Sequence, residues 1–435
     1  MKRFLFPLVM LCLTLSAIAE NYPYRSDYLW YTVPDHADWN YKVGEEASVE
    51  VMFLLYGMPQ DVTVDYAIVD EGTTGEKTLH VTLRNGKAII TGVTSDKPGF
   101  RDVQMQTTLN GVKYQHHIKL AFSPDMIKPY TQEPADFVQW WAKNIAENQK
   151  YPLKYTKELY EPYCTETVDC YIVKIEVNKQ HQSVYGYLTC PKNMERGKHP
   201  VILCPPGAGV KTIKEPNSRN YYPESGFIRL ITEIHGLDPR LPESVFDDIR
   251  AAFDGKTKGY LYQNLDNRDN YYMRHVYEGL VKCIDFLTSM PEWDGKNVIV
   301  QGGSQGGALS LVAAGLDKRV NLVVANHPAL SDMALAVLGG VSGYPHFSAD
   351  DGMLTPERLQ TMAYYDVVNF ARHVTAKTYM TWGYNDNTCP PTTSYAVWNT
   401  LTCPKEKLVT PVNEHWTSDA TNRQQCSWLL EQIKK

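Results

Sequence analysis

A serine enclosed by glycines, directly after an apolar run, constrains this chain more than any other feature. The sequence QGGSQGG at 301–307 follows NVIV at 297–300. A sharp turn from strand to helix brings the incoming and outgoing backbones close together, so the residues two before and two after the central serine must be small. Gly302 and Gly306 occupy those positions around Ser304. The stretch therefore predicts a strand, a tight turn that exposes the serine hydroxyl, and a helix.

Beyond about residue 165, short apolar strands alternate with helical segments. We expect strands at 168–177, 183–191, 200–206, 227–234, 297–303, 320–328, 377–383 and 407–412, and helices at 271–289, 305–316 and 418–433. Such alternation is typical of a mostly parallel sheet covered by helices on both faces. Together with the exposed serine at a strand end, it predicts the α/β-hydrolase fold.

The first part of the chain has a period of two rather than a helical period. Apolar and polar residues alternate from about residue 40 to 122, and Asn-Gly occurs at 85–86 and 110–111 between alternating runs. Both residues tolerate the positive φ of a type I′ turn, so each pair predicts a β-hairpin. We expect a small antiparallel β-sandwich of the Ig-like kind, connected to the rest by an amphipathic helix at 135–149.

The chain of 435 residues exceeds one ordinary domain. Its first residues combine Lys2 and Arg3 with an apolar core and a small-residue end, which is the layout of a secretory signal peptide. We therefore expect a signal peptide at 1–19, a β-sandwich accessory domain at 20–125 and an α/β-hydrolase catalytic domain at 126–435. The protein should be exported and should have no membrane span.

Export permits disulfides. Beyond the expected signal peptide the cysteines are Cys164, Cys170, Cys190, Cys204, Cys283, Cys389, Cys403 and Cys426. The pairs Cys164/Cys170 and Cys389/Cys403 are close enough in sequence to bridge, and burial as small apolar thiols is an equal alternative. Cys12 follows bulky residues within the apolar run, so a lipid anchor there is the minor alternative.

Composition argues against several classes of partner. A formal net charge of -6 leaves no basic stripe for nucleic acid. No Cys-x-x-Cys spacing supports a zinc site, and the adjacent His116 and His117 would point to opposite faces of a strand. We therefore expect no nucleic-acid partner, no metal and no organic cofactor.

A serine hydroxyl is a weak nucleophile until a base accepts its proton and an acid orients that base. In an α/β-hydrolase the acid and then the histidine follow the serine, each in a loop after a later strand. Asp386 follows the expected strand at 377–383, and His415 follows the strand at 407–412. Ser304, Asp386 and His415 are therefore the candidate catalytic residues.

Other residues compete for these roles. Glu414 is the main rival acid, but a residue adjacent to His415 would struggle to reach its Nδ1. Among the histidines, His327 could approach the site but precedes the acidic loop, which would break the chain order. His235 could line the pocket, and His275 is better explained by packing or surface exposure.

The reaction also needs donors for the oxyanion of the tetrahedral intermediate. We expect the backbone N–H of Gln305, the residue after the nucleophile, and that of Gly207, in the loop after the strand at 200–206.

Several stretches resemble one enzyme family. They are DFVQWWAKNIAENQKYPL at 136–153, YYMRHVYEGL at 271–280, NVIVQGGSQGGALSL at 297–311, AYYDVVNF at 363–370 and GYNDNTCPPTTSYAVWN at 383–399. From about residue 135 to its end, the chain resembles the acetyl xylan esterase and cephalosporin C deacetylase family, the seventh carbohydrate esterase family. The combination of G-G-S-Q-G-G with D-x-x-C-P-P is far more specific than G-x-S-x-G alone.

This resemblance implies a serine esterase that removes acetyl groups from xylan-derived sugars and tolerates other small acetate esters. By position it implies Ser304 as nucleophile, His415 as base and Asp386 as its partner, with the amides of Gln305 and near Gly207 as the oxyanion hole. An acetylated oligosaccharide or polysaccharide is then the substrate, in the periplasm or outside a bacterial cell. The resemblance is also consistent with assembly into a homo-oligomer.

The chain departs from the family in three places. The family's Arg-Gly-Gln is His235-Gly236-Leu237 here, and the family's His-Glu is His415-Trp416. The β-rich first hundred residues lie outside the resemblance.

Two other functions stay open at this point. A serine peptidase of the prolyl oligopeptidase type also combines a β-rich N-terminal region with a hydrolase domain, although the region here is too short for a propeller of several blades. A non-catalytic carbohydrate-binding protein could use a hydrolase scaffold, with the β-sandwich recognising the sugar.

Overall fold

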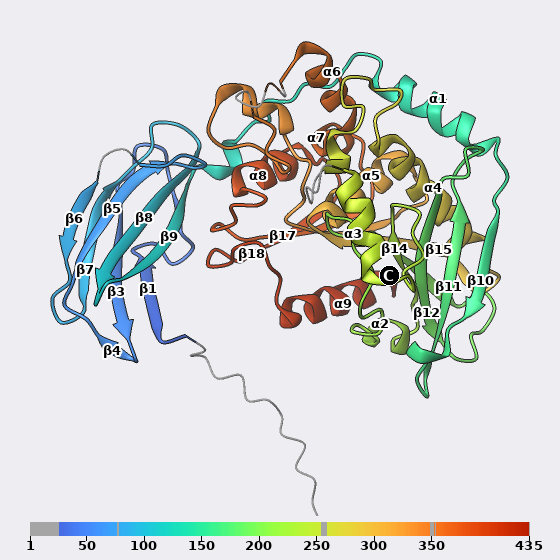
Figure 1. Cartoon of the computed structure of the whole chain (residues 1–435), viewed down its shortest axis with the longest axis horizontal. Coiled ribbons are helices and arrows are strands. Elements are labelled where there is room, and N and C mark those ends of the chain that lie inside the picture. Colours follow the sequence, from blue (N-terminus) through green and yellow to red (C-terminus); the bar gives the residue numbers. More distant parts are fainter. Residues whose placement is uncertain (1–25, 76–77, 254–258, 349–351, 353, 435) are drawn as a thin grey trace, which may run out of the picture.

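The computed structural model describes residues 26–75, 78–253, 259–348, 352 and 354–434. The expected signal peptide at 1–19 and Cys12 lie outside these residues. Within them, a β-sandwich precedes a larger α/β domain, at the left and the right of Figure 1 respectively.

The sandwich consists of two sheets around one apolar core. Its strands are β1 (Tyr28–Pro34), β2 (Asn40–Tyr41), β3 (Ala47–Leu55), β4 (Met58–Pro59), β5 (Thr63–Asp70), β6 (Leu79–Thr82), β7 (Lys87–Val93), β8 (Gly99–Leu109) and β9 (Val112–Phe122). One sheet has the order β1-β3-β4 with β7 also on β3, and the other has the order β2-β9-β8-β5-β6. Alternate residues of β8 and β9, such as Val103 and Ile118, face the shared core.

The two Asn-Gly turns have different outcomes. Both adopt positive φ angles, with values of 52° and 74° at Asn85-Gly86 and of 53° and 77° at Asn110-Gly111. The hairpin predicted at Asn110-Gly111 is confirmed, because β8 and β9 pair antiparallel up to the turn. At Asn85-Gly86 a single antiparallel bridge between Arg84 and Lys87 closes the turn, but the predicted pairing of the flanking strands is wrong: β6 pairs with β5 and β7 pairs with β3. The turn connects one sheet to the other. The residues of a turn determine that the chain reverses direction, but they do not determine which strand each flanking segment pairs with.

The α/β domain is built on a nine-stranded sheet with the order β10-β11-β12-β14-β13-β15-β16-β17-β18. These strands are β10 (Tyr155–Leu159), β11 (Val168–Glu176), β12 (Ser183–Pro191), β13 (His199–Cys204), β14 (Ile228–Glu233), β15 (Trp293–Gly303), β16 (Leu322–Asn326), β17 (Lys377–Trp382) and β18 (Lys405–Val409). Pairing is antiparallel from β10 to β14 and parallel from β14 to β18. The predicted α/β-hydrolase fold is confirmed.

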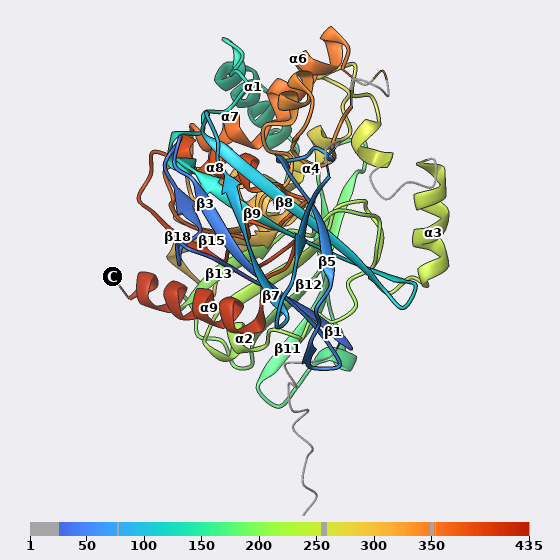
Figure 2. The ribbon, with the colours of Figure 1, turned by 90° about the vertical axis from the view of Figure 1, so that its left-hand side faces the viewer.

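Helices cover both faces of this sheet. They are α1 (Phe137–Gln149), α2 (Tyr221–Glu224), α3 (Glu243–Ala252), α4 (Met273–Ser289), α5 (Gln305–Leu316), α6 (Pro356–Tyr365), α7 (Val367–Ala371), α8 (Pro391–Thr400) and α9 (Asp419–Ile433). In β13, Val201 and Leu203 pack into the core that α4 and α5 share. Ile202 and Cys204 point the other way, into a cluster with α9. Figure 2 shows α1 and α7 on one side of the central strands and α9 on the other.

The sandwich packs on the segment that follows β17. The Phe100 ring of β8 lies 5.0 Å from the ring of Tyr384 and 5.9 Å from that of Tyr395, between centroids. Phe100 and Ala121 belong to the main core of the α/β domain rather than to the core of the sandwich. The two domains therefore share apolar packing across their junction.

A buried ion pair crosses the same junction. The Lys119 Nζ lies 3.0 Å from Oε1 of Glu71 and donates a second hydrogen bond, 2.8 Å long, to the backbone carbonyl of Asp386. The side chains of Lys119 and Glu71 are 0% and 2% exposed. Burial raises the pKa of Glu71, and the ammonium of Lys119 opposes that effect.

All eight described cysteines are free thiols, and all but the half-buried Cys164 are buried. The bridging alternative is therefore not realised, and burial of apolar thiols is. In the part of the chain that the structure describes, no helix is long and apolar enough to cross a membrane.

We predict that Lys119→Met lowers the free energy of unfolding by about 3–5 kcal/mol, because it leaves the Glu71 carboxylate buried without its cation. The double variant Glu71→Leu/Lys119→Met removes both charges and should regain most of that loss. The control Lys97→Met, in an exposed pair with Asp70, should cost under about 1 kcal/mol. Urea denaturation measures all three. Equal losses in the single and double variants would show that the charge pairing is not the cause.

Candidate active site

Ser304 occupies a strained turn between β15 and α5. Its φ of 58° and ψ of -125° lie outside the ordinary regions for a residue with a side chain. The Ser304 N–H donates to the Asn326 carbonyl of β16 over 3.0 Å, and the Ser304 carbonyl accepts from the Ala308 N–H of α5 over 3.0 Å. Neighbouring elements on both sides thus hold the conformation that exposes the hydroxyl.

The flanking glycines are required by close backbone contacts. A Cβ on Gly302 would lie 2.4 Å from the backbone of Gly306, and a Cβ on Gly306 would lie 2.5 Å from the carbonyl oxygen of Pro205. A Cβ on Gly307 would lie 2.6 Å from the carbonyl oxygen of Asn326. The absence of side chains therefore lets β15, β16, α5 and the loop after β13 meet around one serine.

The two expected oxyanion donors lie on segments that the structure brings together. Gln305 is the first residue of α5, and the Cβ position of Gly207 lies 4.0 Å from the Gly303 carbonyl oxygen. The hydroxyl of Tyr260 connects the segments, since it accepts the Gly209 N–H over 3.2 Å and donates to Oε1 of Gln305. The first-turn N–H groups of a helix point toward its N-terminus, where they can stabilise negative charge.

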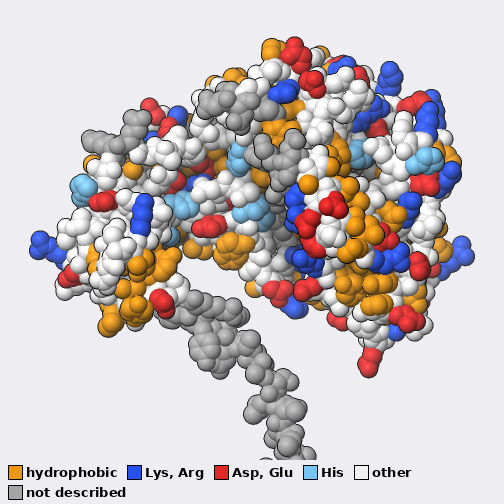
Figure 3. Space-filling view, viewed as in Figure 1, with side chains coloured by type: hydrophobic (Ala, Val, Ile, Leu, Met, Phe, Trp, Pro, Cys, Tyr) orange, Lys and Arg blue, Asp and Glu red, His pale blue; other side chains and the backbone are white. Residues whose placement is uncertain are grey.

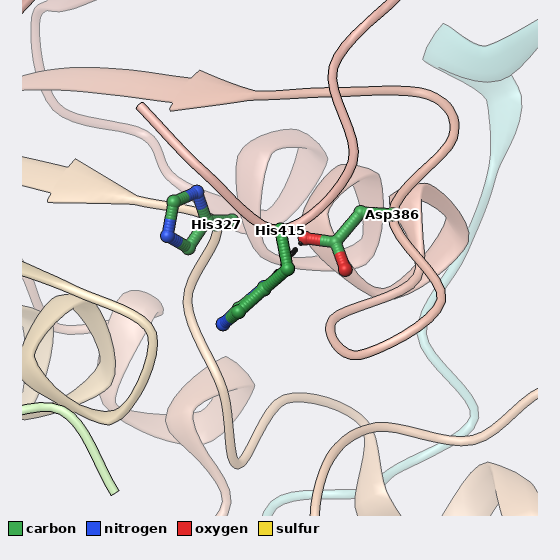
Figure 4. A group of neighbouring side chains, drawn as sticks. All are labelled: His327, Asp386 and His415. Carbon is green, nitrogen blue, oxygen red and sulfur yellow. Dashed lines mark hydrogen bonds and ion pairs between the residues drawn. The ribbon is translucent and has the colours of Figure 1, made fainter. Parts of the chain in front are cut away.

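Asp386 and His415 meet as expected. The His415 Nδ1 lies 2.8 Å from Oδ2 of Asp386, while Oδ1 of Asp386 accepts the N–H groups of Thr388 and Cys389, each over 2.8 Å. Asp386 is fully buried and the His415 side chain is 26% exposed. Figure 4 shows the second ring nitrogen of His415 directed away from the carboxylate. The rival acid Glu414 is exposed.

Among the described residues, no hydrogen bond joins the Ser304 hydroxyl to His415. Burial raises the pKa of the nearby Cys389 thiol, and the Ser304 side chain opposes that effect. Catalytic hydrogen bonds are often long or misaligned without substrate and tighten in the complex.

His327 lies much closer to the site than its place in the chain suggested. The two rings lie side by side in Figure 4, with their centroids 4.4 Å apart, and burial lowers the pKa of His327 to about 4. A neutral ring thus flanks the proposed base. The ligand atoms of His327, Asp386 and His415 lie within 4.8 Å of one another, so within the part of the chain that the structure describes this trio could hold a metal ion. A metal there would compete with the hydrogen bond between Asp386 and His415.

His235 supports the loop that carries Gly207. Its Nδ1 lies 2.8 Å from the Tyr272 hydroxyl and its Nε2 lies 3.3 Å from the Gly209 carbonyl. Burial lowers the pKa of His235 to about 4, so a neutral imidazole stands where the family has arginine. Glu233 closes this turn by accepting the N–H groups of His235 and Leu237 over 2.6 and 2.9 Å.

The remaining predicted positions have simpler surroundings. His275 packs in α4 with its ring 4.6 Å from that of Tyr272, as its helical position suggested. Trp416, which replaces the family's glutamate, is 52% exposed beside His415.

Comparison with known proteins connects these features to one family. The acetyl xylan esterase (AXE1) family matches residues 123–432. The acetyl esterase Axe7A of Xylanibacter ruminicola is 57% identical over 435 residues, which is 100% of this chain and 98% of that protein.

Solved structures show the same fold in the α/β domain. An acetyl xylan esterase from Paenibacillus sp. R4 is 26% identical with a TM-score of 0.63, over 71% of this chain and 98% of that one. Acetyl xylan esterase 1 from Thermoanaerobacterium sp. JW/SL YS485 is 22% identical with a TM-score of 0.61, over 71% and 97% of the two chains. The sandwich precedes the residues that match the family.

We predict that Gly306→Ala lowers the free energy of unfolding by about 1–3 kcal/mol or more, since the new methyl group overlaps the Pro205 carbonyl. The control Gly207→Ala meets no atom nearer than 3.9 Å and should change stability by under about 0.5 kcal/mol. Denaturant titration compares the two. Unaltered stability of Gly306→Ala would refute close backbone contact as the reason for glycine.

A second prediction concerns pH. Burial raises the pKa of Glu233 to about 7, above the ~4.3 of an unfolded chain. The folded protein then holds a proton that the unfolded chain has released, so this group's contribution to stability falls as pH rises between those values. The contribution should total up to ~4 kcal/mol. Stability against pH should be flatter in Glu233→Gln than in the unaltered protein, and parallel curves would contradict the raised pKa.

Proposed function

Because the chain belongs to the acetyl xylan esterase family, we propose that it hydrolyses acetyl esters of xylan or xylo-oligosaccharides through an acyl-enzyme on Ser304. The chain is an acetyl esterase, a carboxylic ester hydrolase. The peptidase and the non-catalytic carbohydrate-binding protein are therefore set aside.

The observation that carries the proposed mechanism is the 2.8 Å contact between His415 Nδ1 and Asp386 Oδ2. It joins two loops that follow neighbouring parallel strands, β17 and β18, at the sheet edge where β15 presents Ser304. Asp386 can fix the tautomer in which Nδ1 carries the proton, which leaves Nε2 free to act as a base.

The proposed reaction has two halves. Ser304 Oγ attacks the acetyl carbonyl carbon, while His415 Nε2 takes its proton. The N–H groups of Gln305 and Gly207 stabilise the oxyanion. When the tetrahedral intermediate collapses, His415 returns the proton to the departing sugar oxygen. Water then attacks the acetyl-serine by the same steps, which releases acetate and restores Ser304.

We also propose that the protein is exported. The basic start, apolar run and small-residue end of residues 1–19 support a signal peptide, and acetylated plant polysaccharide is a substrate met outside the cytoplasm. As part of this proposal, the exported protein consists of a sandwich domain at 20–125 and a catalytic domain at 126–435.

We predict that Ser304→Ala lowers kcat on p-nitrophenyl acetate by about 10⁶-fold and that Asp386→Asn lowers it by about 10⁴-fold. The fold should be retained, as judged by circular dichroism. The control Ser289→Ala, at the end of α4, should keep full activity. A chelator should not reduce turnover. Retention of more than about a tenth of the activity by Ser304→Ala would remove that residue from the nucleophile's role.

A further inference from the structure

The outer face of the five-stranded sheet carries a regular array of polar side chains. Across the β8/β9 ladder, Gln104 lies opposite His117 and Gln106 lies opposite Gln115. The adjacent Lys119 continues this face into the buried junction with the α/β domain. The strand residues between them, such as Val103 and Ile118, fill the sandwich core instead.

This polar face forms one wall of a cleft of about 440 Å³, which we call the junction cleft. Asn387 and Glu414 supply the opposite wall, and both are exposed. Asn387 immediately follows Asp386, and Glu414 immediately precedes His415. The cleft therefore lies between the sandwich and the two loops that carry the proposed acid and base. Figure 3 shows pale-blue histidine side chains at this junction.

A second cavity, of about 750 Å³, adjoins the junction cleft. The two cavities share Asp102, Gln104 and Asn387. The second one extends under the segment 336–348 of the α/β domain. Along the strand direction, the accessible part of this face on β9, from His117 to Gln115, spans ~7 Å, and the second cavity extends it. Together the two cavities are long enough to contact several parts of an extended ligand that runs past the loop carrying Asp386.

The chemistry of the junction cleft favours a neutral, hydroxyl-rich ligand. Its described lining contains no lysine or arginine. It contains the carboxylates of Asp65, Asp102 and Glu414 and the rings of His116 and His117. Asp102 is buried and lies 3.1 Å from Nδ1 of His117, and Asp65 lies 2.7 Å from Nδ1 of His80, so Glu414 is the carboxylate left without a histidine partner among these three. Carboxylates accept hydrogen bonds from hydroxyl groups, and the amides of Gln106 and Gln115 can both donate and accept. An anionic ligand would meet unfavourable charge there.

We propose that the junction cleft binds the neutral sugar backbone of the substrate, beside the acetyl ester that Ser304 cleaves. This inference rests on the proposed function and assigns the sandwich a direct part in recognising glycan chains. On this proposal the junction cleft binds unsubstituted stretches of xylan and disfavours stretches that carry uronate groups. The competing explanation is that a sandwich simply presents polar side chains to water.

The double variant Gln106→Ala/Gln115→Ala tests the proposal with little risk to the fold. Neither amide forms a hydrogen bond within the described part of the chain, and Gln115 is exposed. We expect kcat/KM on acetylated xylo-oligosaccharides to fall about tenfold, mostly through a higher KM, since two hydrogen bonds to substrate are lost. Hydrolysis of p-nitrophenyl acetate should change less than about twofold, because that ester does not reach the cleft.

The matched control is Gln60→Ala, which makes the same change after β4 and lines neither cavity. It should leave both activities unchanged. An equal loss on both substrates in the double variant, or no loss on the oligosaccharides, would overturn the proposal.

Failure of the proposed function is distinguishable from failure of this inference. If the unaltered enzyme cleaves p-nitrophenyl acetate but no acetylated xylo-oligosaccharide, the assigned substrate is wrong. The cleft is then tested directly by titrating the Ser304→Ala protein with xylo-oligosaccharides that are either neutral or uronate-bearing. Tighter binding of the neutral set, weakened when Gln106→Ala/Gln115→Ala is added, supports a glycan cleft. No binding, or equal binding of both sets, overturns it.

Discussion

A buried ammonium group joins the two domains of this protein at the loop that carries Asp386. Lys119 bonds to the carboxylate of Glu71 within its own sandwich and to the Asp386 carbonyl of the other domain. Its backbone N–H also donates to the Asn385 side chain over 2.9 Å. A charge in this position is stable only while all of its partners stay in place. The geometry of the acid loop therefore depends on a domain that lies outside the family's catalytic unit.

The glycine-flanked serine imposes a second constraint on the same site. Four chain segments approach Ser304 closely enough that a methyl group on Gly302, Gly306 or Gly307 would meet backbone atoms. Tyr260 holds the loop that carries Gly207 and Gly209 against this turn, and one hydrogen bond joins His415 to Asp386. Rigid strands set these positions, so the loops need little freedom to reach a productive arrangement.

Local sequence was sufficient to predict the features that local chemistry decides. The strand before Ser304, the meeting of Asp386 and His415 after later strands, and the Asn110-Gly111 hairpin agree with the residue types and spacing. The error at Asn85-Gly86 has a physical cause, since the choice of partner strand depends on packing between sheets. The contact between Lys119 and Asp386 spans 267 positions in sequence and has no local signature. The closeness of His327 to His415 was not predicted, because His327 was judged by its place in the order of catalytic residues along the chain. That order does not show which side chains lie next to each other in the fold.

The shared packing around Phe100 has a consequence for how this enzyme can evolve. Because that ring lies on Tyr384 and Tyr395 rather than within its own sandwich, separating the two halves would uncover aromatic surface immediately beside the acid loop. A recombinant protein in which one of the two domains is exchanged would need an apolar side chain in place of Phe100 and a cation in place of Lys119 at the junction. The two domains therefore depend on each other for burial of this aromatic surface, so we expect them to unfold together in a single thermal transition.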